Sequence, residues 1–244
     1  MKKSIQLLVC GAFLVTFIAN AQWSSNDKKK GNGTVVTETR TTADYDAIKV
    51  SGSFDVDLVA GKEGKIIIKG EENLLSAIKV EVEGNVLKIY TEKGINIKSS
   101  IGKKIQVTIP FEKIAEVTLS GSGNIQSKDV IKNDAFLARL SGSGNFNLAV
   151  DSNNLELNLS GSGNVRLKGN AVNFTTKLSG SGDIDTADLQ SKNVNVTVSG
   201  SGNSKINCKE SLTARVSGSG NIKYTGNPEK RDVKVSGSGN ISKV

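Results

Sequence analysis

A five-residue motif, Ser-Gly-Ser-Gly followed by Asn or Asp, occurs seven times in the second half of the chain. The copies begin at Ser120, Ser141, Ser160, Ser179, Ser199, Ser217 and Ser236, with separations of 21, 19, 19, 20, 18 and 19 residues. A Ser/Gly string alone is typical of a flexible linker. A nearly fixed period instead indicates a solenoid, in which each unit buries its apolar side by stacking on its neighbours.

The flanks of the motif alternate strictly between apolar and polar residues. The residue before each copy is aliphatic: Leu119, Leu140, Leu159, Leu178, Val198, Val216 and Val235. The residue after the Asn or Asp is Ile125, Phe146, Val165, Ile184, Ser204, Ile222 and Ile241, apolar in every copy but one. Period-two alternation predicts strands with one buried side. Counted in steps of two, both glycines lie inward and the serines and the Asn or Asp lie outward.

The repeat therefore predicts an all-β fold, a parallel β-helix whose rungs of two or three short strands stack about 4.8 Å apart. The glycines mark either a bend or a close approach of the opposite wall. The last motif position would form a column of Asn124, Asn145, Asn164, Asp183, Asn203, Asn221 and Asn240. This column is interpreted either as an amide ladder between rungs or as turn chemistry that suits Asn. Both interpretations stay open.

The first half follows the same pattern less regularly. Ser51-Gly52-Ser53, in AIKVSGSFDVDL, predicts a degenerate first rung. Further strands are expected at Lys65–Lys69, Ile78–Val82, Val86–Tyr90 and Ile105–Ile109, with a hairpin at Glu83-Gly84-Asn85 and a helical turn at Glu71–Ala77. This irregular, partly antiparallel region would cap the edge strand of the solenoid. At the other end, Lys243 is the only evident charged residue that could protect the exposed edge strand from pairing with another chain.

The N-terminus has the pattern of a secretory signal peptide, with Lys2 and Lys3 before an apolar run and Ala19-Asn20-Ala21 as the cleavage signal. A membrane anchor is less well supported because the run is short. Three segments are expected: a signal peptide at 1–21, a tether and first edge segment at 22–44, and one solenoid domain at 45–244. That domain divides into a degenerate, capping half (45–116) and a regular half (117–244). The solvated tether is placed at Gln22–Gly33.

Signal removal lowers the net charge from +8 to +6 and removes Cys10, which leaves Cys208 as the single thiol. The exported chain then has no internal disulfide, although its compartment permits one. A nucleic-acid role is not expected, because no basic stripe with interleaved aromatic residues is found. No integral membrane segment is expected after signal removal.

Three stretches of this chain resemble a known family: YDAIKVSGSFDVDL, VTIPFEKIAEVTLSGSGNI and the serial S-G-S-G-N copies. They are similar to the family named putative auto-transporter adhesin, head GIN domain, found in secreted proteins of Bacteroides-like bacteria. The resemblance covers residue 45 to the C-terminus. It implies a right-handed parallel β-helix and a location in the cell envelope or outside the cell. It supplies no catalytic residues.

The chain offers little for catalysis. It contains no His, which excludes Ser-His-Asp and Cys-His systems and His-ligated zinc. Asp183 and Asp185, with Asp188 nearby, are the best carboxylate cluster, and Asp55 and Asp57 form a similar outward pair. Outward acids on a strand are usually a solvated face. No catalytic residue, cofactor or metal site is predicted, and a calcium-binding roll is disfavoured because its period is about nine residues.

The sequence therefore predicts an exported, non-enzymatic, structural or adhesin-like module. Its candidate binding face consists of Ser120, Ser122, Asn124, Ser141, Ser143, Asn145, Ser160, Ser162, Asn164, Ser179, Ser181, Asp183, Ser199, Ser201, Asn203, Ser217, Ser219 and Asn221. The partner is unknown, with a cell-surface glycan, a protein or a second copy as candidates. The location is the periplasm, the outer-membrane surface or outside the cell. A carbohydrate-active enzyme using the Asp183 region and a self-assembling, fibre-like repeat protein are the alternatives.

Overall fold

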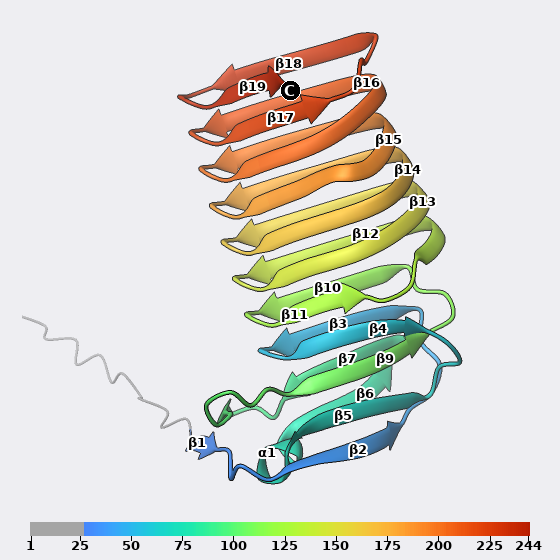
Figure 1. Cartoon of the computed structure of the whole chain (residues 1–244), viewed down its shortest axis with the longest axis vertical. Helices are drawn as coiled ribbons and strands as arrows, with labels where there is room; N and C mark the ends of the chain where they lie inside the picture. The colour runs from blue at the N-terminus through green and yellow to red at the C-terminus, as the bar shows by residue number, and fades with distance from the viewer. Residues whose placement is uncertain (1–26) are drawn as a thin grey trace, which may run out of the picture.

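The computed structural model describes residues 27–244, which form an almost entirely β structure. One sheet of seventeen strands winds into a parallel solenoid of about seven turns, with an antiparallel region near the N-terminus (Figure 1). The predicted parallel β-helix and its irregular N-terminal cap are confirmed. The predicted signal peptide, which includes Cys10, lies outside the described residues.

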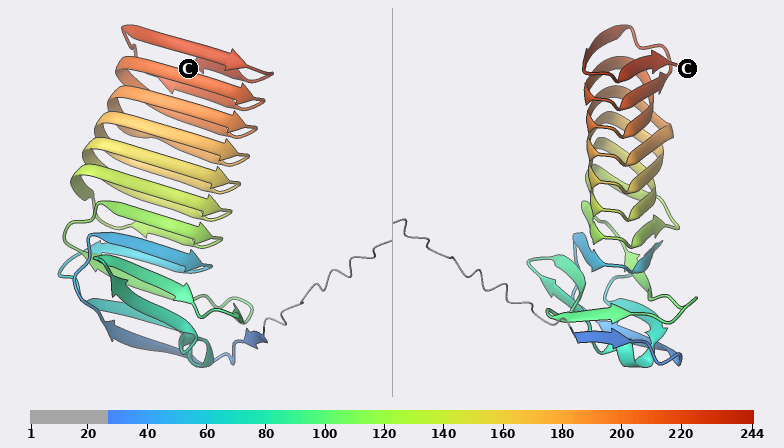
Figure 2. Two further views of the ribbon diagram at one scale, coloured as in Figure 1. Left: turned by 180° about the vertical axis from the view of Figure 1, so that it is seen from behind. Right: turned by 90° about the vertical axis from the view of Figure 1, so that its left-hand side faces the viewer.

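Each regular rung consists of two strand segments that pack face to face, joined by the motif at a narrow edge (Figure 2). We call this the motif edge and the opposite, wider bend the round edge. Segments that run into the motif form the upstream face, and segments that leave it form the downstream face. The strands are β10 (Glu116–Gly121), β11 (Asn124–Ser127), β12 (Ile131–Gly142), β13 (Asn145–Gly161), β14 (Asn164–Gly180), β15 (Asp183–Gly200), β16 (Asn203–Gly218), β17 (Asn221–Thr225), β18 (Lys230–Ser236) and β19 (Asn240–Lys243).

The motif copies stack in register, as the sequence predicts. Ser120 pairs with Ser141, Ser141 with Ser160, and so on to Ser217 with Ser236. The degenerate first rung is also confirmed, because β3 (Ala47–Gly52) pairs in parallel with β10 and sets Ser51 and Gly52 beside Ser120 and Gly121. The strand after it, β4 (Asp55–Ala60), pairs with β11 in the same way.

The core is a single cluster of apolar side chains, stacked in several inward columns inside the solenoid. The aliphatic residues before the first six motifs are all buried, and so are the apolar residues after them. Phe54, Phe146 and Tyr224 also point inward. One irregularity is Ser204, which is buried between Ile184 and Ile222 with a hydroxyl that has no hydrogen-bond partner.

The motif glycines are required by the neighbouring rung, and not by the opposite wall. Gly161 has a φ of +118°, and a Cβ on it would lie 2.4 Å from the carbonyl oxygen of Gly142. A Cβ on Gly163 would lie 2.3 Å from the carbonyl oxygen of Gly144 and 2.9 Å from Leu140. The backbone N–H groups of Ser162 and Gly163 both donate to the Gly142 carbonyl, at 3.0 Å each. The bend and the close stacking thus use the same two positions.

Differences in rung length are absorbed at the round edge. The pairing of β14 with β15 shifts between Arg166 and Gly169, and that of β15 with β16 shifts on both sides of Ser191. Register returns before the next motif in both cases. Bulges of this kind add or remove residues without moving the inward columns.

The cap closes the first rung with antiparallel strands. The strand β2 (Val35–Thr41) pairs antiparallel with β5 (Lys65–Glu71), and β5 pairs antiparallel with β9 (Gln106–Phe111). The expected hairpin joins β6 (Ile78–Glu83) to β7 (Val86–Thr91) through Gly84 and Asn85, which have φ values of 56° and 62°. Since β7 and β9 pair in parallel with β3 and β4, they connect the cap to the solenoid.

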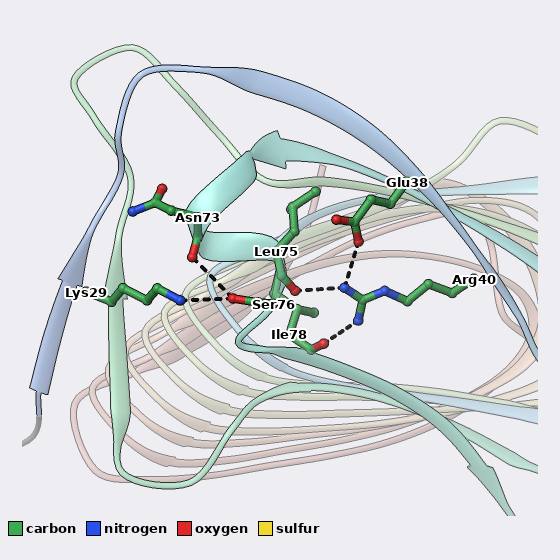
Figure 3. Close-up of polar contacts among 7 residues, drawn as sticks. All are labelled: Lys29, Glu38, Arg40, Asn73, Leu75, Ser76 and Ile78. Atoms are coloured by element: carbon green, nitrogen blue, oxygen red, sulfur yellow. Dashed lines mark hydrogen bonds and ion pairs between the residues drawn. The ribbon is translucent and has the colours of Figure 1, made fainter.

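A short helix, α1 (Glu72–Leu75), lies at the predicted helical turn and is held by polar contacts (Figure 3). The Arg40 guanidinium donates to the Leu75 carbonyl at 2.7 Å and to the Ile78 carbonyl, and forms an ion pair with Glu38 at 3.0 Å. Lys29 donates to the Ser76 hydroxyl at 2.9 Å. The Arg40 guanidinium thus provides a donor for the Leu75 carbonyl, one of the groups that a helix end leaves without an intrahelical partner.

Glu71 joins three segments of the cap. Its carboxylate is buried and accepts hydrogen bonds from the Ser100 hydroxyl at 2.6 Å, the Ser100 N–H at 2.8 Å and the Gly33 N–H at 2.6 Å. The Ser100 hydroxyl and N–H, together with the Gly33 N–H, lower the pKa of Glu71 below its usual range, because they stabilise the ionised form. Nearby, β1 (Asp27–Lys30) pairs in parallel with β8 (Ile95–Lys98).

The segment Gln22–Gly33, expected to be a solvated tether, thus includes a paired strand. Lys28 and Lys30 are exposed, in keeping with solvation, while Lys29 is half-buried. Between residues 27 and 244, no helix is both long and apolar enough to span a bilayer.

Candidate binding surface

The motif serines form two exposed columns along the motif edge. All twelve candidate serines, from Ser120 and Ser122 to Ser217 and Ser219, are exposed. Within residues 27–244, none of their hydroxyl groups forms a hydrogen bond with another protein group. The hydroxyls are therefore available to water or to a ligand.

The Asn column forms an amide ladder between rungs. Each side-chain amide donates to the preceding rung: Asn124 to Asp55 at 2.6 Å, Asn145 to Asn124 at 2.7 Å and Asn164 to Asn145 at 3.0 Å. A second run begins at Asp183, which accepts from Asn203 at 3.0 Å, and Asn221 donates to Asn203 at 2.9 Å. Of the two interpretations left open by the sequence, the ladder is therefore the one observed.

The ladder is interrupted at Asp183. Asn164 uses its amide nitrogen on the preceding rung, so its oxygen faces the following rung. There Asp183, as a carboxylate, has no proton to donate. Each run of the ladder thus has an aspartate at its accepting end, Asp55 for the first and Asp183 for the second.

A polar furrow runs beside the ladder on the downstream face. It consists of a hollow of about 290 Å³ near the cap and a larger one of about 690 Å³ along β13–β17, which share Asn145, Phe146 and Asn147 in their lining. Ladder residues from Asn124 to Asn221 line one side of it. The outward column of Gln126, Asn147, Arg166, Asp185, Lys205 and Lys223 lines the other side. The candidate Asn and Asp residues therefore share the furrow, whereas the motif serines lie outside it.

The carboxylates of the furrow all have polar partners. Asp185 forms an ion pair with Arg166 at 3.3 Å, and Asp183 accepts from both the side chain and the backbone of Asn203. In the smaller hollow, Asp55 pairs with Lys104 at 2.8 Å. A general acid needs an environment that keeps its proton, such as burial in an apolar pocket. These carboxylates lie instead at an open surface beside cationic and amide groups.

The remaining acids of the sequence-based clusters are arranged similarly. Asp57 pairs with Lys128 at 3.3 Å and accepts from Gln126 at 2.6 Å. Asp188 is exposed and does not line the larger hollow. The structure therefore brings Asp183 and Asp185 together but leaves Asp188 outside.

A second amide ladder was not predicted from the sequence. On the upstream face, Asn173 donates to Asn154 and Asn193 donates to Asn173, both at 3.0 Å. A hollow of about 390 Å³ beside it is lined by Asn154, Asn173, Thr175 and Lys177 among others. The available signal was positional, since Asn154, Asn173 and Asn193 each lie six residues before a motif serine.

The last rung is more exposed than the others. Val233 is 51% exposed and Val235 is 41% exposed, although both occupy inward columns. Two other inward positions of this rung carry charges: Arg231 follows Leu212, and Lys243 follows Tyr224. Arg231 also donates to the Tyr224 hydroxyl at 3.2 Å. Lys243 is therefore not the only charged residue that protects this edge, because Arg231 adds a charge at an inward position.

The single thiol of the described chain does not form a reactive site. Cys208 is fully buried, and burial raises the pKa of its thiol. Its sulfur lies 3.1 Å from the Ser211 carbonyl oxygen, to which the thiol donates. Among residues 27–244, no three His, Cys, Asp or Glu side chains are grouped so as to hold a metal ion.

These features define a capped parallel β-solenoid with a repetitive polar surface. The chain belongs to the family described as "Putative auto-transporter adhesin, head GIN domain", whose model matches residues 44–228. No curated protein matches the sequence.

Solved structures share the fold. A putative adhesin from Bacteroides fragilis is 22% identical, with a TM-score of 0.82 over 88% of this chain and 100% of that one. A putative lipid binding protein from Parabacteroides distasonis is 26% identical, with a TM-score of 0.73 over 89% of this chain and 99% of that one. A putative adhesin from Parabacteroides merdae is also 26% identical, with a TM-score of 0.68 and the same coverage.

Proposed function

We propose that the chain is an exported, non-enzymatic, adhesin-like module that binds a cell-surface glycan or protein. The binding site would be the candidate face of motif serines and ladder Asn and Asp residues, called here the Ser/Asn face. The family and the two adhesin neighbours support the general class. The observation that carries the proposal is the furrow, which places amides and charged groups of successive rungs along two adjoining hollows that share Asn145, Phe146 and Asn147.

The repetition of the face suits binding better than catalysis. Each rung offers similar hydroxyl and amide groups, and single polar contacts of this kind contribute little on their own. Several contacts made at once by an extended ligand give a much higher overall affinity, because the later ones form intramolecularly. Catalysis needs one distinctive constellation of groups. Asp183 and Asp185, which are bonded to Asn203 and Arg166 respectively, do not provide it.

Lipid binding enters through one neighbour, the protein from Parabacteroides distasonis. In this chain, apolar side chains fill the core of the described solenoid, and the furrow is lined mainly by polar side chains. Neutral and anionic lipid vesicles therefore belong in the binding screen as a separate arm. Vesicle binding without glycan or cell binding contradicts the proposed glycan or protein partner.

The test is a binding screen of the full chain on glycan arrays and intact cells. Asn147→Lys places a bulky charge in the furrow, and Ser162→Lys does so on the motif edge. Asn170→Lys, on the exposed round edge, is a control with the same charge change. We expect the first two variants to weaken binding and the control to keep it. If all three variants bind as tightly as the unaltered chain, the Ser/Asn face is excluded as the binding site.

Self-association through the last rung is a second candidate, favoured by the exposure of Val233 and Val235. Unpaired strand edges with apolar residues readily add another strand. If copies associate here, light scattering rises with protein concentration, and Ile241→Lys, in the half-buried neighbouring strand, reduces the rise. Scattering that stays flat for the unaltered chain rejects this candidate.

A further inference from the structure

A column of basic residues runs along the upstream face, one position before the inward aliphatic residues. From the cap outward its members are Lys88, Lys49, Thr118, Arg139, Asn158, Lys177, Thr197, Arg215 and Lys234. No acidic residue interrupts it. Between Lys49 and Arg215 a cation occupies every second rung, and a small polar residue occupies each rung between.

This alternation fixes a distance. Rungs stack about 4.8 Å apart, so neighbouring cations of the column are about 9.6 Å apart along the axis. An extended peptide presents side chains on one face about every 6.8 Å, and a nucleic-acid strand presents a phosphate about every 3.4 Å. Neither spacing matches. A sugar ring in an extended linear glycan advances by roughly one rung, so a glycan with an acid on alternate sugars matches two rungs.

The cations of the column are only partly neutralised. Lys49 and Arg139 share one carboxylate, that of Glu116, at 3.7 and 3.9 Å. Arg215 pairs with Asp232. Lys177 is exposed, and within residues 27–244 no carboxylate oxygen lies within 4.0 Å of its amine. The adjacent outward column, two residues earlier in each strand, carries Glu116, Glu156 and Asp232. Among the cations between Lys49 and Arg215, Lys177 is therefore the one that is open to an anionic partner without first giving up an ion pair.

A hollow in the upstream face lies beside Lys177, the central cation of the column. The upstream hollow of about 390 Å³ has Lys177 and Thr175 on its lining, together with Asn154 and Asn173 of the second amide ladder and one carboxylate, that of Glu156. The ladder holds these amides in fixed orientations, since each is bonded to the next rung. The Glu156 carboxylate accepts a hydrogen bond from the Asn158 side chain at 2.8 Å. Oriented amides and the Glu156 carboxylate can bond the hydroxyl groups of a sugar, and Lys177 can bond a carboxylate that the sugar carries.

We propose that the upstream face binds a linear glycan that carries a carboxylate on alternate sugars. The carboxylates lie against Arg139, Lys177 and Arg215, and the intervening neutral sugars lie against Asn158 and Thr197. This site is separate from the Ser/Asn face, which lies on the motif edge and the downstream face. Its ligand class is narrower, because the spacing of the cations selects the spacing of the acids.

The test measures binding of the full chain to three immobilised polymers by biolayer interferometry. Hyaluronan has an acid on alternate sugars, polygalacturonate has one on every sugar, and dextran is neutral. We expect hyaluronan to bind most tightly and dextran not to bind. Binding should weaken as NaCl is raised, because salt screens exposed charges. Arg139→Gln/Lys177→Gln/Arg215→Gln should weaken hyaluronan binding at least about tenfold, from the loss of three exposed ionic contacts.

A matched variant removes the same charge from the other face: Arg166→Gln/Lys205→Gln/Lys223→Gln. It should keep hyaluronan binding within about twofold, a small change in binding free energy. Asn158→Lys/Thr197→Lys fills the column and should shift the preference toward polygalacturonate. Absence of hyaluronan binding, or equal loss in both triple variants, overturns the inference. Binding to neutral glycans or proteins through the furrow survives either result, so the two proposals fail separately.

Discussion

The cap and the regular rungs share one continuous core, but different contacts hold them together. In the cap, single side chains join segments far apart in sequence, as Glu71 does with Gly33 and Ser100, and Tyr45 with the Pro110 carbonyl. In the rungs, the same contact recurs: inward aliphatic residues, a glycine bend and a bond to the preceding rung. A substitution in the cap should therefore disturb one junction, whereas one in a motif disturbs the rungs on both sides.

The largest expected effect is in the motif. Gly161→Ala places a methyl group against the Gly142 carbonyl at a positive φ that alanine rarely adopts. Backbone strain and overpacking together predict a loss of about 2–6 kcal/mol in the free energy of unfolding. Urea denaturation measures it. Ser162→Ala, at the exposed position next to it, should change the free energy by less than about 0.5 kcal/mol. Equal effects from both variants would remove the stacking explanation.

The next effect lies in the cap. Glu71→Gln replaces a carboxylate that accepts three hydrogen bonds, so the melting temperature should fall well below that of Glu72→Gln, an exposed neighbour. The pKa of Glu71 is lowered in the folded state, so its contribution is complete above the usual glutamate range, about 4.3. It is lost as pH falls from there through the lowered pKa. The difference between the two variants should therefore narrow in acid; a constant difference contradicts this account.

An intermediate effect of opposite sign is expected at Ser204. Ser204→Val removes a buried hydroxyl without a partner and fills a column whose neighbours are Ile184 and Ile222. The gain should be about 1–2 kcal/mol in the free energy of unfolding. Ser204→Ala separates the two causes, because it removes the hydroxyl but adds no volume. A loss of stability in both variants indicates that the hydroxyl is bonded within the core.

The smallest effect concerns the interrupted ladder. Asp183→Asn should join the two runs, because the new amide can donate to Asn164 and still accept from Asn203. One added exposed hydrogen bond predicts a gain of about 0.5–1 kcal/mol. The double variant Asp183→Asn/Asp185→Asn also tests the enzyme alternative on a polysaccharide panel. Turnover by the unaltered chain that disappears in the double variant establishes catalysis; its absence on every polymer counts against it.

The regular rungs could be predicted because their signal is local. Alternation around each motif identified the inward residues, and the spacing identified the stack, including the degenerate rung at Ser51. Short stretches of sequence are also enough to locate the Asn column, the glycine columns and the hairpin at Gly84-Asn85. In each case one neighbouring rung, with known register, supplies the missing partner.

Contacts that depend on several rungs or on distant segments could not be predicted in the same way. The Glu71 junction joins residues separated by 29 and 38 positions, and no periodicity relates them. The basic column repeats over two rungs, twice the period of the motif, so Thr118, Asn158 and Thr197 conceal it. The furrow depends on how far the side chains of the ladder and of the Arg166 column rise above the backbone between them, which the sequence pattern does not specify.

The in-register stacking of Gly161 on Gly142 and of Gly180 on Gly161 makes consecutive units interchangeable. Gene duplication of one such unit would lengthen the rod by about 4.8 Å and leave the joints on either side chemically unchanged. The reach of a molecule of this design can therefore be adjusted in equal steps, by whole modules, without any redesign of the end that starts the coil.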